Sequence, residues 1–174
     1  FDITYLATLP NFIVMAASDE AELVRMINTS IMINDRPSAF RYPRGNGIGI
    51  ELPNINEVLK IGKAKLIQEG KRIALLNFGA RLQECKKASE VLSKKGINIT
   101  IGDARFVKPL DEKLIMEIAT SHEALITIEE GSIGGFGSHV SQLLSERGVF
   151  DNGLKFRSMI LPDEFLDQDT PEKM

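Results

Sequence analysis

The chain has 174 residues, of which 43% are hydrophobic and 26% are charged, and its formal net charge is −3. This composition is typical of a globular protein with one core or two small domains, and it excludes a disordered tail. The acidic balance excludes a basic stripe for nucleic acid, and no apolar run reaches the roughly 18 residues needed to span a bilayer, so neither nucleic acid nor membrane is expected as a partner.

The first fifty residues predict a strand, a helix and a second strand. The opening residues 1–12 are rich in strand-like apolar side chains, and residues 11–18 form a short strand candidate. Asp19, followed three residues later by Glu22, resembles a capping box and predicts the start of a helix. A second strand then ends at Pro43 and a glycine-rich turn.

Strands and helices alternate from residue 61 onward. Two strands are joined at Gly70, and the second, residues 73–78, has the near-continuous apolar character of a strand covered on both faces. A helix over residues 80–95 closes at Gly96, because glycine adopts the left-handed conformation that ends helices. Another strand follows this helix.

The next helix is predicted to begin at Asp111. Leu110 and Ile115 lie at the positions of a hydrophobic staple around this N-cap residue. His122 comes near the C-terminal end of the helix, where it can bond the last carbonyls, and we favour that role over catalysis.

The alternation predicts an α/β fold. Three strand–helix units end on a strand over residues 154–161, which indicates a three-layer, mostly parallel sheet with right-handed crossovers. The strand near Lys65 is the expected antiparallel edge. Residues 51–60 read as a linker between a partial α/β domain, residues 1–50, and a second domain, residues 61–174.

Glycines at positions 131, 134, 135 and 137 follow the strand over residues 124–130. A strand that runs through a glycine loop into a helix can bind a phosphate. The spacing does not match the dinucleotide fingerprint, and no P-loop Lys-Ser/Thr pair follows, so we favour close packing. Glu129 and Glu130 point to opposite faces of the strand and do not readily form an acid–base pair; we expect one of them to cap the helix.

Arginines at the end of the second strand are candidates for anion binding. Arg41 and Arg44 flank a Tyr-Pro pair, and a guanidinium held at a strand end can grip a phosphate or carboxylate through paired N–H bonds. The pattern alone leaves open whether Arg44 binds an anion or is a surface residue. Arg105 and Lys108, in a positive loop ahead of Asp111, are assigned structural roles.

Neither cysteine nor histidine predicts a reactive site. Cys85 is the only cysteine and lies on an apolar helix face, so we expect a core residue rather than a reactive thiol. His122 and His139 have no partner at a spacing that indicates a metal site or a triad. With no signal-peptide pattern and no possible internal disulfide, the chain is expected to be cytoplasmic.

Five segments, in this order and spacing, resemble the C-terminal part of 1-deoxy-D-xylulose-5-phosphate synthase: FDITYLATLPNFIVMAASDEAEL, PSAFRYPRGNG, RFVKPLD, SHEALITIEEGSIGGFGSHV and LPDEF. The resemblance covers essentially the whole chain. It is more specific than a likeness to the transketolase superfamily, because YPRGN and EEGSIGGFGSHV together are characteristic of this synthase. It implies a homodimeric enzyme that uses thiamine diphosphate and Mg²⁺ and condenses pyruvate with glyceraldehyde 3-phosphate. The products are 1-deoxy-D-xylulose 5-phosphate, a precursor of isoprenoids, thiamine and pyridoxal, and carbon dioxide.

The resemblance also assigns the parts of the chain. It implies that residues 1–50 end a pyrimidine-binding domain and that residues 61–174 form a transketolase-like C-terminal domain. The family's magnesium and diphosphate motif, its pyrimidine-activating Glu and its active-site His have no counterpart here. Both ends of the sequence look cut, and we expect the chain alone to be inactive, with no catalytic, cofactor or metal-binding residue and no bound cofactor.

One functional residue carries over from the family. The Arg of its Tyr-Pro-Arg-Gly motif binds the phosphate of glyceraldehyde 3-phosphate, and this residue is Arg44. The glycine loop, residues 131–137, falls in the domain that does not hold the cofactor, which implies close packing within the chain or at a subunit contact. The alternatives are a transketolase, a 2-oxoacid dehydrogenase β-subunit, or a non-catalytic docking or dimerisation module.

Overall fold

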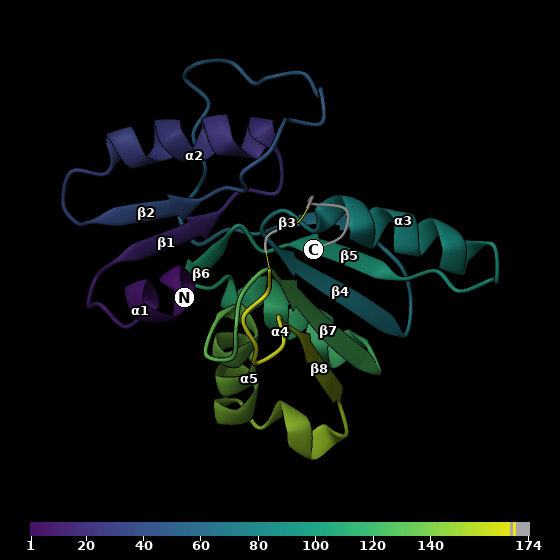
Figure 1. The fold of residues 1–174 in the computed structure, drawn as a ribbon. Coiled ribbons are helices and arrows are strands. Elements are labelled where there is room, and N and C mark those ends of the chain that lie inside the picture. Colours follow the sequence, from purple (N-terminus) through teal and green to yellow (C-terminus); the bar gives the residue numbers. More distant parts are fainter. Residues whose placement is uncertain (168, 170–174) are drawn as a thin grey trace.

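The computed structural model describes residues 1–167 and residue 169, which form two sheets (Figure 1). The smaller sheet has the strand order β2-β1-β6, and the larger has the order β3-β5-β4-β7-β8. The elements in chain order are α1 (Asp2–Ala7), β1 (Ile13–Ala16), α2 (Glu20–Met32), β2 (Ser38–Arg41), β3 (Lys65–Gln68), β4 (Ile73–Phe78), α3 (Leu82–Ser93), β5 (Thr100–Asp103), β6 (Phe106–Lys108), α4 (Glu112–Ser121), β7 (Ala124–Glu129), α5 (Phe136–Glu146), the 3-10 helix η1 (Val149–Asn152) and β8 (Lys155–Met159). None of the helices in this part of the chain is long and apolar enough to cross a membrane.

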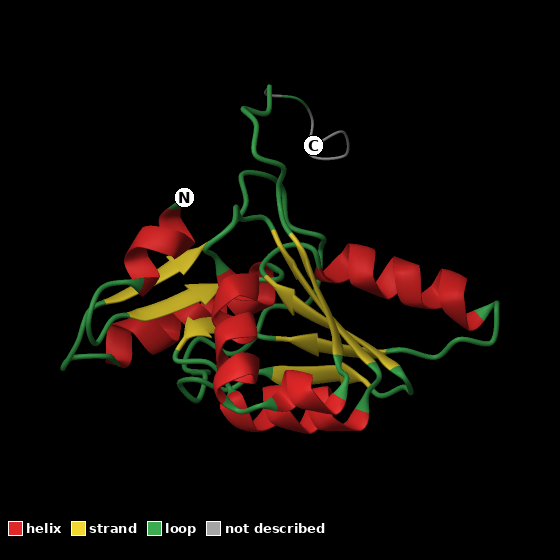
Figure 2. Cartoon of the chain, turned by 90° about the horizontal axis from the view of Figure 1, so that it is seen from below, coloured by secondary structure: helices red, strands yellow, loops and turns green. Residues whose placement is uncertain are grey.

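The larger sheet confirms the predicted three-layer α/β fold. Strand β4 is parallel to β5 on one side and to β7 on the other, and β8 is parallel to β7. Strand β3 is antiparallel to β5 at the edge, so β5 lies between the two strands that are joined at Gly70. Helix α3 packs on one face through Leu82 and Cys85, and α4 and α5 pack on the other (Figure 2).

Residues 106–108 form strand β6, which corrects the expectation of a loop. The strand pairs antiparallel with β1, so it joins the N-terminal sheet although it lies far along the chain. Phe106 and Val107 are both buried on opposite faces, Phe106 under α2 and Val107 in the main core, which is the alternation of a strand. Lys108 Nζ donates to the carbonyls of Ala7 and Leu9 at 2.8 and 2.6 Å and so holds the end of α1.

The opening residues form a helix, so their reading as strand-like residues is wrong. Ile3 and Ala7, four residues apart, are both buried, and Leu6 packs against the same core. This spacing places one helix face against the core, whereas a strand would bury every second residue. Composition alone could not separate the two patterns over so short a segment.

Several predicted helix ends are confirmed. Asp19 accepts a hydrogen bond from the Glu22 N–H at 2.8 Å, and Asp111 accepts one from the Leu114 N–H at 3.2 Å. Each bond satisfies a backbone donor that the first turn of a helix leaves free. Gly96, with φ of 76°, ends the α3 segment in the left-handed conformation.

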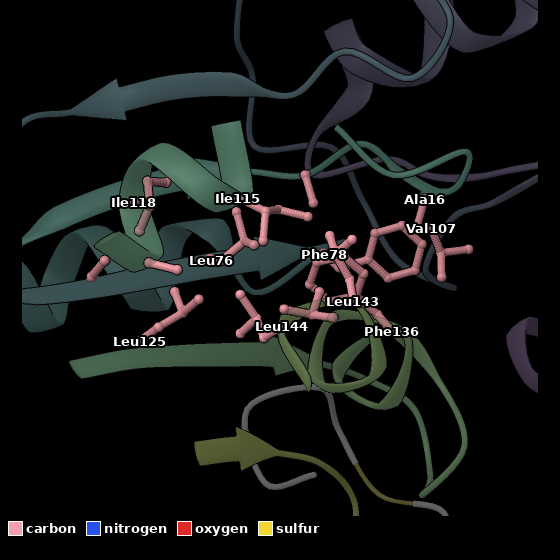
Figure 3. Close-up of a cluster of buried hydrophobic side chains, with 14 of the residues drawn as sticks. Ala16, Leu76, Phe78, Val107, Ile115, Ile118, Leu125, Phe136, Leu143 and Leu144 are labelled. Carbon is pink, nitrogen blue, oxygen red and sulfur yellow. The ribbon is translucent and has the colours of Figure 1, made fainter. Parts of the chain in front are cut away.

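The main hydrophobic core lies where the two sheets meet. Phe78, at the end of β4, stacks on Phe136, at the start of α5, with ring centroids 4.8 Å apart. Ala16 of β1 and Val107 of β6 belong to the same buried cluster (Figure 3). Burial of each large apolar side chain contributes about 1.5–3 kcal/mol, so this shared core fixes the position of the N-terminal sheet against the larger one.

Residues 51–60 contain no helix or strand and pack along α2. Leu59 is buried, and its N–H donates to Thr29 Oγ1 at 2.7 Å. Arg25 Nε donates to Glu57 Oε1 at 2.7 Å. This segment is therefore held against the helix at both an apolar and a polar contact.

Candidate functional site

The loop after β2 presents Arg44 to solvent. Residues 42–50 are all exposed, and within the described part of the chain the Arg44 side chain has no hydrogen-bond or ion-pair partner. The guanidinium therefore keeps all its N–H donors for an external acceptor. A planar fork of donors is suited to a phosphate or a carboxylate.

The same loop is held at its far end by Glu20, from the first turn of α2. The Glu20 carboxylate accepts hydrogen bonds from the N–H groups of Ile48, Gly49 and Ile50 at 3.1, 2.6 and 3.0 Å. Its own backbone N–H and these three groups together lower the pKa of Glu20, against a smaller opposing effect of desolvation. A Cβ on Gly47 would lie 2.8 Å from the Glu20 carboxyl carbon, so glycine allows this close approach.

Arg41 has a different environment from Arg44. Its side chain is only 18% exposed, and its Nη1 lies 3.4 Å from Asp2 Oδ1 and 3.5 Å from the Glu130 carbonyl oxygen. The guanidinium carbon lies 5.8 Å from the centroid of the Phe78 ring, within cation–π range. Arg41 thus connects the end of β2 to α1 and to the loop after β7 through Nη1, while its buried Nη2 has no hydrogen-bond partner within the described residues.

The N-terminus of α5 is filled by a carboxylate of this chain. Glu129 is 5% exposed and accepts hydrogen bonds from the N–H groups of Phe136 at 3.0 Å and Gly137 at 2.8 Å. A Cβ at Gly131 or Gly135 would collide with the Glu129 carboxylate, so these glycines make room for it. The prediction that one of the two glutamates caps the helix is confirmed, and the place where a phosphate would bind is taken.

The rest of the glycine loop is closely packed. A Cβ on Gly134 would lie 3.1 Å from Thr4 Cγ2, so the loop contacts α1. Glu130 forms an ion pair with Arg81, at 2.7 Å between Oε1 and Nη2, on the α3 side of the sheet. The two glutamates therefore serve separate contacts and form no acid–base pair.

Burial raises the pKa of Glu129 above its usual value. The hydrogen bonds from Gly137 and Phe136 and the charge of Arg41 oppose this rise, but desolvation is the larger effect. A carboxylate moved out of water loses hydration that two N–H bonds only partly replace.

A second buried carboxylate, Asp103, lies at the C-terminal end of β5. It accepts hydrogen bonds from Ser18 Oγ at 2.7 Å and from Asn77 Nδ2 at 3.4 Å, so it bridges the two sheets. Burial raises the pKa of Asp103 to about 6, and the carboxylate of Glu22 adds to the rise. The bond from Ser18 and the charge of Arg105 act in the opposite direction.

Glu22 forms a buried ion pair instead of the reciprocal capping-box contact. Its Oε1 lies 2.7 Å from Arg105 Nη2 and 3.0 Å from Arg25 Nη1, and Glu22 itself is 3% exposed. The predicted capping box is therefore only partly present: Asp19 caps the helix, but the Glu22 side chain does not bond back to Asp19. Arg105 and Lys108 both make contacts within the fold, which agrees with the structural roles assigned to them.

The remaining candidates for chemistry are engaged in the fold. His122 Nδ1 lies 2.9 Å from the Ile118 carbonyl and Nε2 lies 2.7 Å from Thr100 Oγ1, which confirms its role at the helix end. Burial lowers the pKa of His139. Cys85 is buried in the α3 cluster, and burial raises the pKa of its thiol to about 11, so it is a core residue as predicted. Within residues 1–167 and 169 no cluster of ligands could hold a metal ion.

Sequence reasoning missed Glu20 and the internal role of Arg41. The signal for Glu20 is the Asp-Glu pair at the helix start, since Asp19 caps the helix and leaves Glu20 free for another contact. The alternating glycines Gly45, Gly47 and Gly49 mark the loop that approaches it. Arg41 has no comparable local signal, because its partners come from α1 and from the loop after β7.

Comparison with known proteins finds one family and a solved relative. Residues 62–174 match the family described as "Transketolase, C-terminal domain". A structure titled "Split gene transketolase, inactive beta4 tetramer" has a TM-score of 0.78 and 25% sequence identity, over 93% of this chain and 52% of that chain. The chain therefore spans about half the length of this relative.

Proposed function

Since the chain belongs to the transketolase C-terminal domain family, we propose that it is the C-terminal part of a 1-deoxy-D-xylulose-5-phosphate synthase. The proposed reaction is the condensation of pyruvate with glyceraldehyde 3-phosphate, with loss of carbon dioxide. The observation that carries the proposal is the exposed, unpaired guanidinium of Arg44 in the sequence Tyr-Pro-Arg-Gly. The sequence Glu-Glu-Gly-Ser-Ile-Gly-Gly-Phe, which begins at the last residue of β7, supports the same assignment.

We propose no thiamine diphosphate site among the described residues. The one helix that follows a glycine loop, α5, has the Glu129 carboxylate on its first N–H groups, and that part of the chain holds no metal-ligand cluster. Thiamine diphosphate supplies the carbanion chemistry in enzymes that use it. We therefore assign the cofactor and Mg²⁺ to parts of the enzyme outside this chain and derive no chemical step from the chain itself.

The role proposed for this chain is to bind the phosphorylated substrate. Arg44 would donate charge-assisted N–H bonds to the phosphate of glyceraldehyde 3-phosphate, and such bonds are about twice as strong as neutral ones. Pyruvate carries no phosphate, so this contact would distinguish the acceptor from the donor substrate. Arg41 is less suited to the task, because its side chain is only 18% exposed and its Nη1 faces Asp2. Its Nη2 is buried and has no hydrogen-bond partner within the described residues.

The test is the substitution Arg44→Ala in the full-length enzyme that carries this chain. Loss of a charge-assisted contact costs about 1.5–3 kcal/mol, so the KM for glyceraldehyde 3-phosphate should rise about ten- to hundredfold while that for pyruvate stays nearly constant. Steady-state assays with each substrate varied in turn measure both constants.

The matched control is Arg36→Ala. Arg36 is also exposed and lies just before β2, but its guanidinium pairs with Asp35. This variant should leave both constants unchanged. Equal effects of Arg44→Ala on the two substrates, or no deoxyxylulose phosphate from the unmodified enzyme, would refute the proposed function.

Transketolase activity is the second candidate, because the solved relative is titled a split gene transketolase. A transketolase takes its two-carbon unit from a ketose phosphate, whereas the synthase takes it from pyruvate. Supplying the full-length enzyme with one donor at a time therefore separates the two. The 2-oxoacid dehydrogenase β-subunit is a weaker alternative, since nothing observed here favours it over these two.

Self-association is also proposed for this chain. The relative is titled an inactive tetramer, and we infer by analogy that this chain alone lacks activity and forms at least a homodimer. Such a piece would act as a docking or dimerisation unit for the rest of the enzyme. Sedimentation of the isolated chain would show a monomer if this inference is wrong.

A further inference from the structure

We propose that Glu20 is a positioning residue for Arg44, which it serves by fixing the loop of residues 42–50. The proposal rests on the proposed function for what Arg44 binds, but the contact itself does not depend on it. Glu20 itself is not proposed to touch the substrate. It acts by holding the backbone that carries Arg44.

The contact is a carboxylate enclosed by backbone donors. Three consecutive N–H groups, those of Ile48, Gly49 and Ile50, point at the two carboxylate oxygens of Glu20. Gly49 has φ of 82°, a left-handed conformation that other residues rarely adopt. Consecutive N–H groups of this kind form an anion-binding concavity, and here the anion is the side chain.

Glu20 has no other task in the fold that explains this geometry. Asp19 already caps α2 by accepting the N–H of Glu22. Glu20 is partly exposed, and within the described residues no other side chain bonds its carboxylate. Apart from the N–H of Glu20 itself at the start of α2, the groups that bond this carboxylate all belong to the loop.

Arg44 lies between two fixed points of the backbone. On one side, Arg41 ends a strand, and its carbonyl accepts the N–H of Ala17 at 3.0 Å. On the other side, residues 48–50 are held by Glu20. Between them the loop contains Gly45 and Gly47, which lose more conformational freedom than other residues when they are ordered. Without the Glu20 contact, the conformational freedom of the loop would have to be lost when the substrate binds.

This arrangement predicts a selective effect on the phosphorylated substrate. Ordering a loop in advance removes a cost that otherwise reduces affinity. Release of the loop should therefore weaken the phosphate contact and leave pyruvate unaffected. The expected rise in KM for glyceraldehyde 3-phosphate is about three- to tenfold, smaller than for loss of Arg44 itself, because the guanidinium remains present.

The experiment compares Glu20→Gln and Glu20→Ala in the full-length enzyme. Amide hydrogen exchange at residues 48–50 reports on the loop, and the two KM values report on the substrates. Glutamine keeps one acceptor oxygen, so its effects should be smaller than those of alanine. Glu112→Gln is the matched control, since Glu112 is also a first-turn glutamate but pairs with Arg147 instead of a loop.

The supporting result is faster exchange at 48–50, a higher KM for glyceraldehyde 3-phosphate alone, and loss of that KM effect when Arg44→Ala is already present. Unchanged exchange would overturn the contact. Faster exchange with equal effects on both substrates, or with an effect that persists beside Arg44→Ala, would overturn the positioning role. If Arg44→Ala itself shows no selectivity, the proposed function and the positioning role both fail, and the exchange data still decide on the contact.

Discussion

Two glycine-containing loops follow parallel strands in this molecule, and both place backbone N–H groups around a glutamate. After β7, the N–H groups of Phe136 and Gly137 donate to Glu129, which is 5% exposed. After β2, three N–H groups of residues 48–50 donate to Glu20, which is partly exposed. The first carboxylate has a raised pKa and the second a lowered one, because burial outweighs the hydrogen bonds only for Glu129.

The comparison shows why glycine spacing is a weak signal for phosphate binding. A loop rich in glycine frees backbone N–H groups, but an anion from the same chain can take them. The buried Glu129 carboxylate accepts the N–H groups of the loop before α5. The partly exposed Glu20 carboxylate accepts the N–H groups of the loop after β2. Of the two loops, only the second leaves a guanidinium, that of Arg44, without an internal partner among the described residues.

The largest difference between the two loops should appear in stability. Glu129→Ala removes the acceptor of two buried N–H groups, each of which costs about 1–3 kcal/mol when unsatisfied, so the free energy of unfolding should fall by about 2–6 kcal/mol. Glu20→Ala exposes its three N–H groups to water, which can bond them, and should change stability much less. Urea unfolding of both variants measures this difference. Similar decreases in the free energy of unfolding for the two variants would contradict the proposed difference between a buried helix cap and a partly exposed loop contact.

The pH dependence of stability at Asp103 tests whether burial determines the direction of a carboxyl pKa shift. Because its folded pKa is raised to about 6 from 3.8, the folded state binds more protons between these values, and its contribution to stability is lost as pH rises. The unfolding free energy of the unmodified chain should therefore fall, relative to that of Asp103→Asn, by up to about 3 kcal/mol between pH 4 and pH 8.

Urea unfolding at several pH values measures this change for Asp103→Asn. Asp35→Asn is its control, because Asp35 is exposed and its ion pair with Arg36 lowers its pKa. The control should show no such loss with rising pH. A flat difference for Asp103→Asn would mean that the bonds from Ser18 and Asn77 offset burial.

Local signals predicted the α/β alternation and several individual contacts. The caps at Asp19 and Asp111, the core position of Cys85 and the helix-end role of His122 each follow from neighbours within one or two turns. Hydrophobic periodicity and capping are local properties, so a sequence can show them directly. The prediction that one of the two glutamates caps α5 belongs to the same class.

Contacts between distant segments were not predictable in the same way. Strand β6 exists because Phe106 and Val107 are buried on opposite sides, Phe106 in the cluster under α2 and Val107 in the main core. Glu22 forms an ion pair with Arg105 because the pairing of β6 with β1 places that arginine beside α2. Helix α1 was missed since six residues are too few for a clear period. The loop contact of Glu20 likewise joins residues about thirty positions apart.

The central claim is that phosphate is bound at the loop after β2 and not at the glycine loop before α5. The most direct measurement is amide hydrogen exchange of the full-length enzyme with and without glycerol 3-phosphate, which carries the phosphate without the reactive aldehyde. We expect slower exchange over residues 42–50 and no change over residues 131–137. Protection of residues 131–137, with residues 42–50 unchanged, would contradict it.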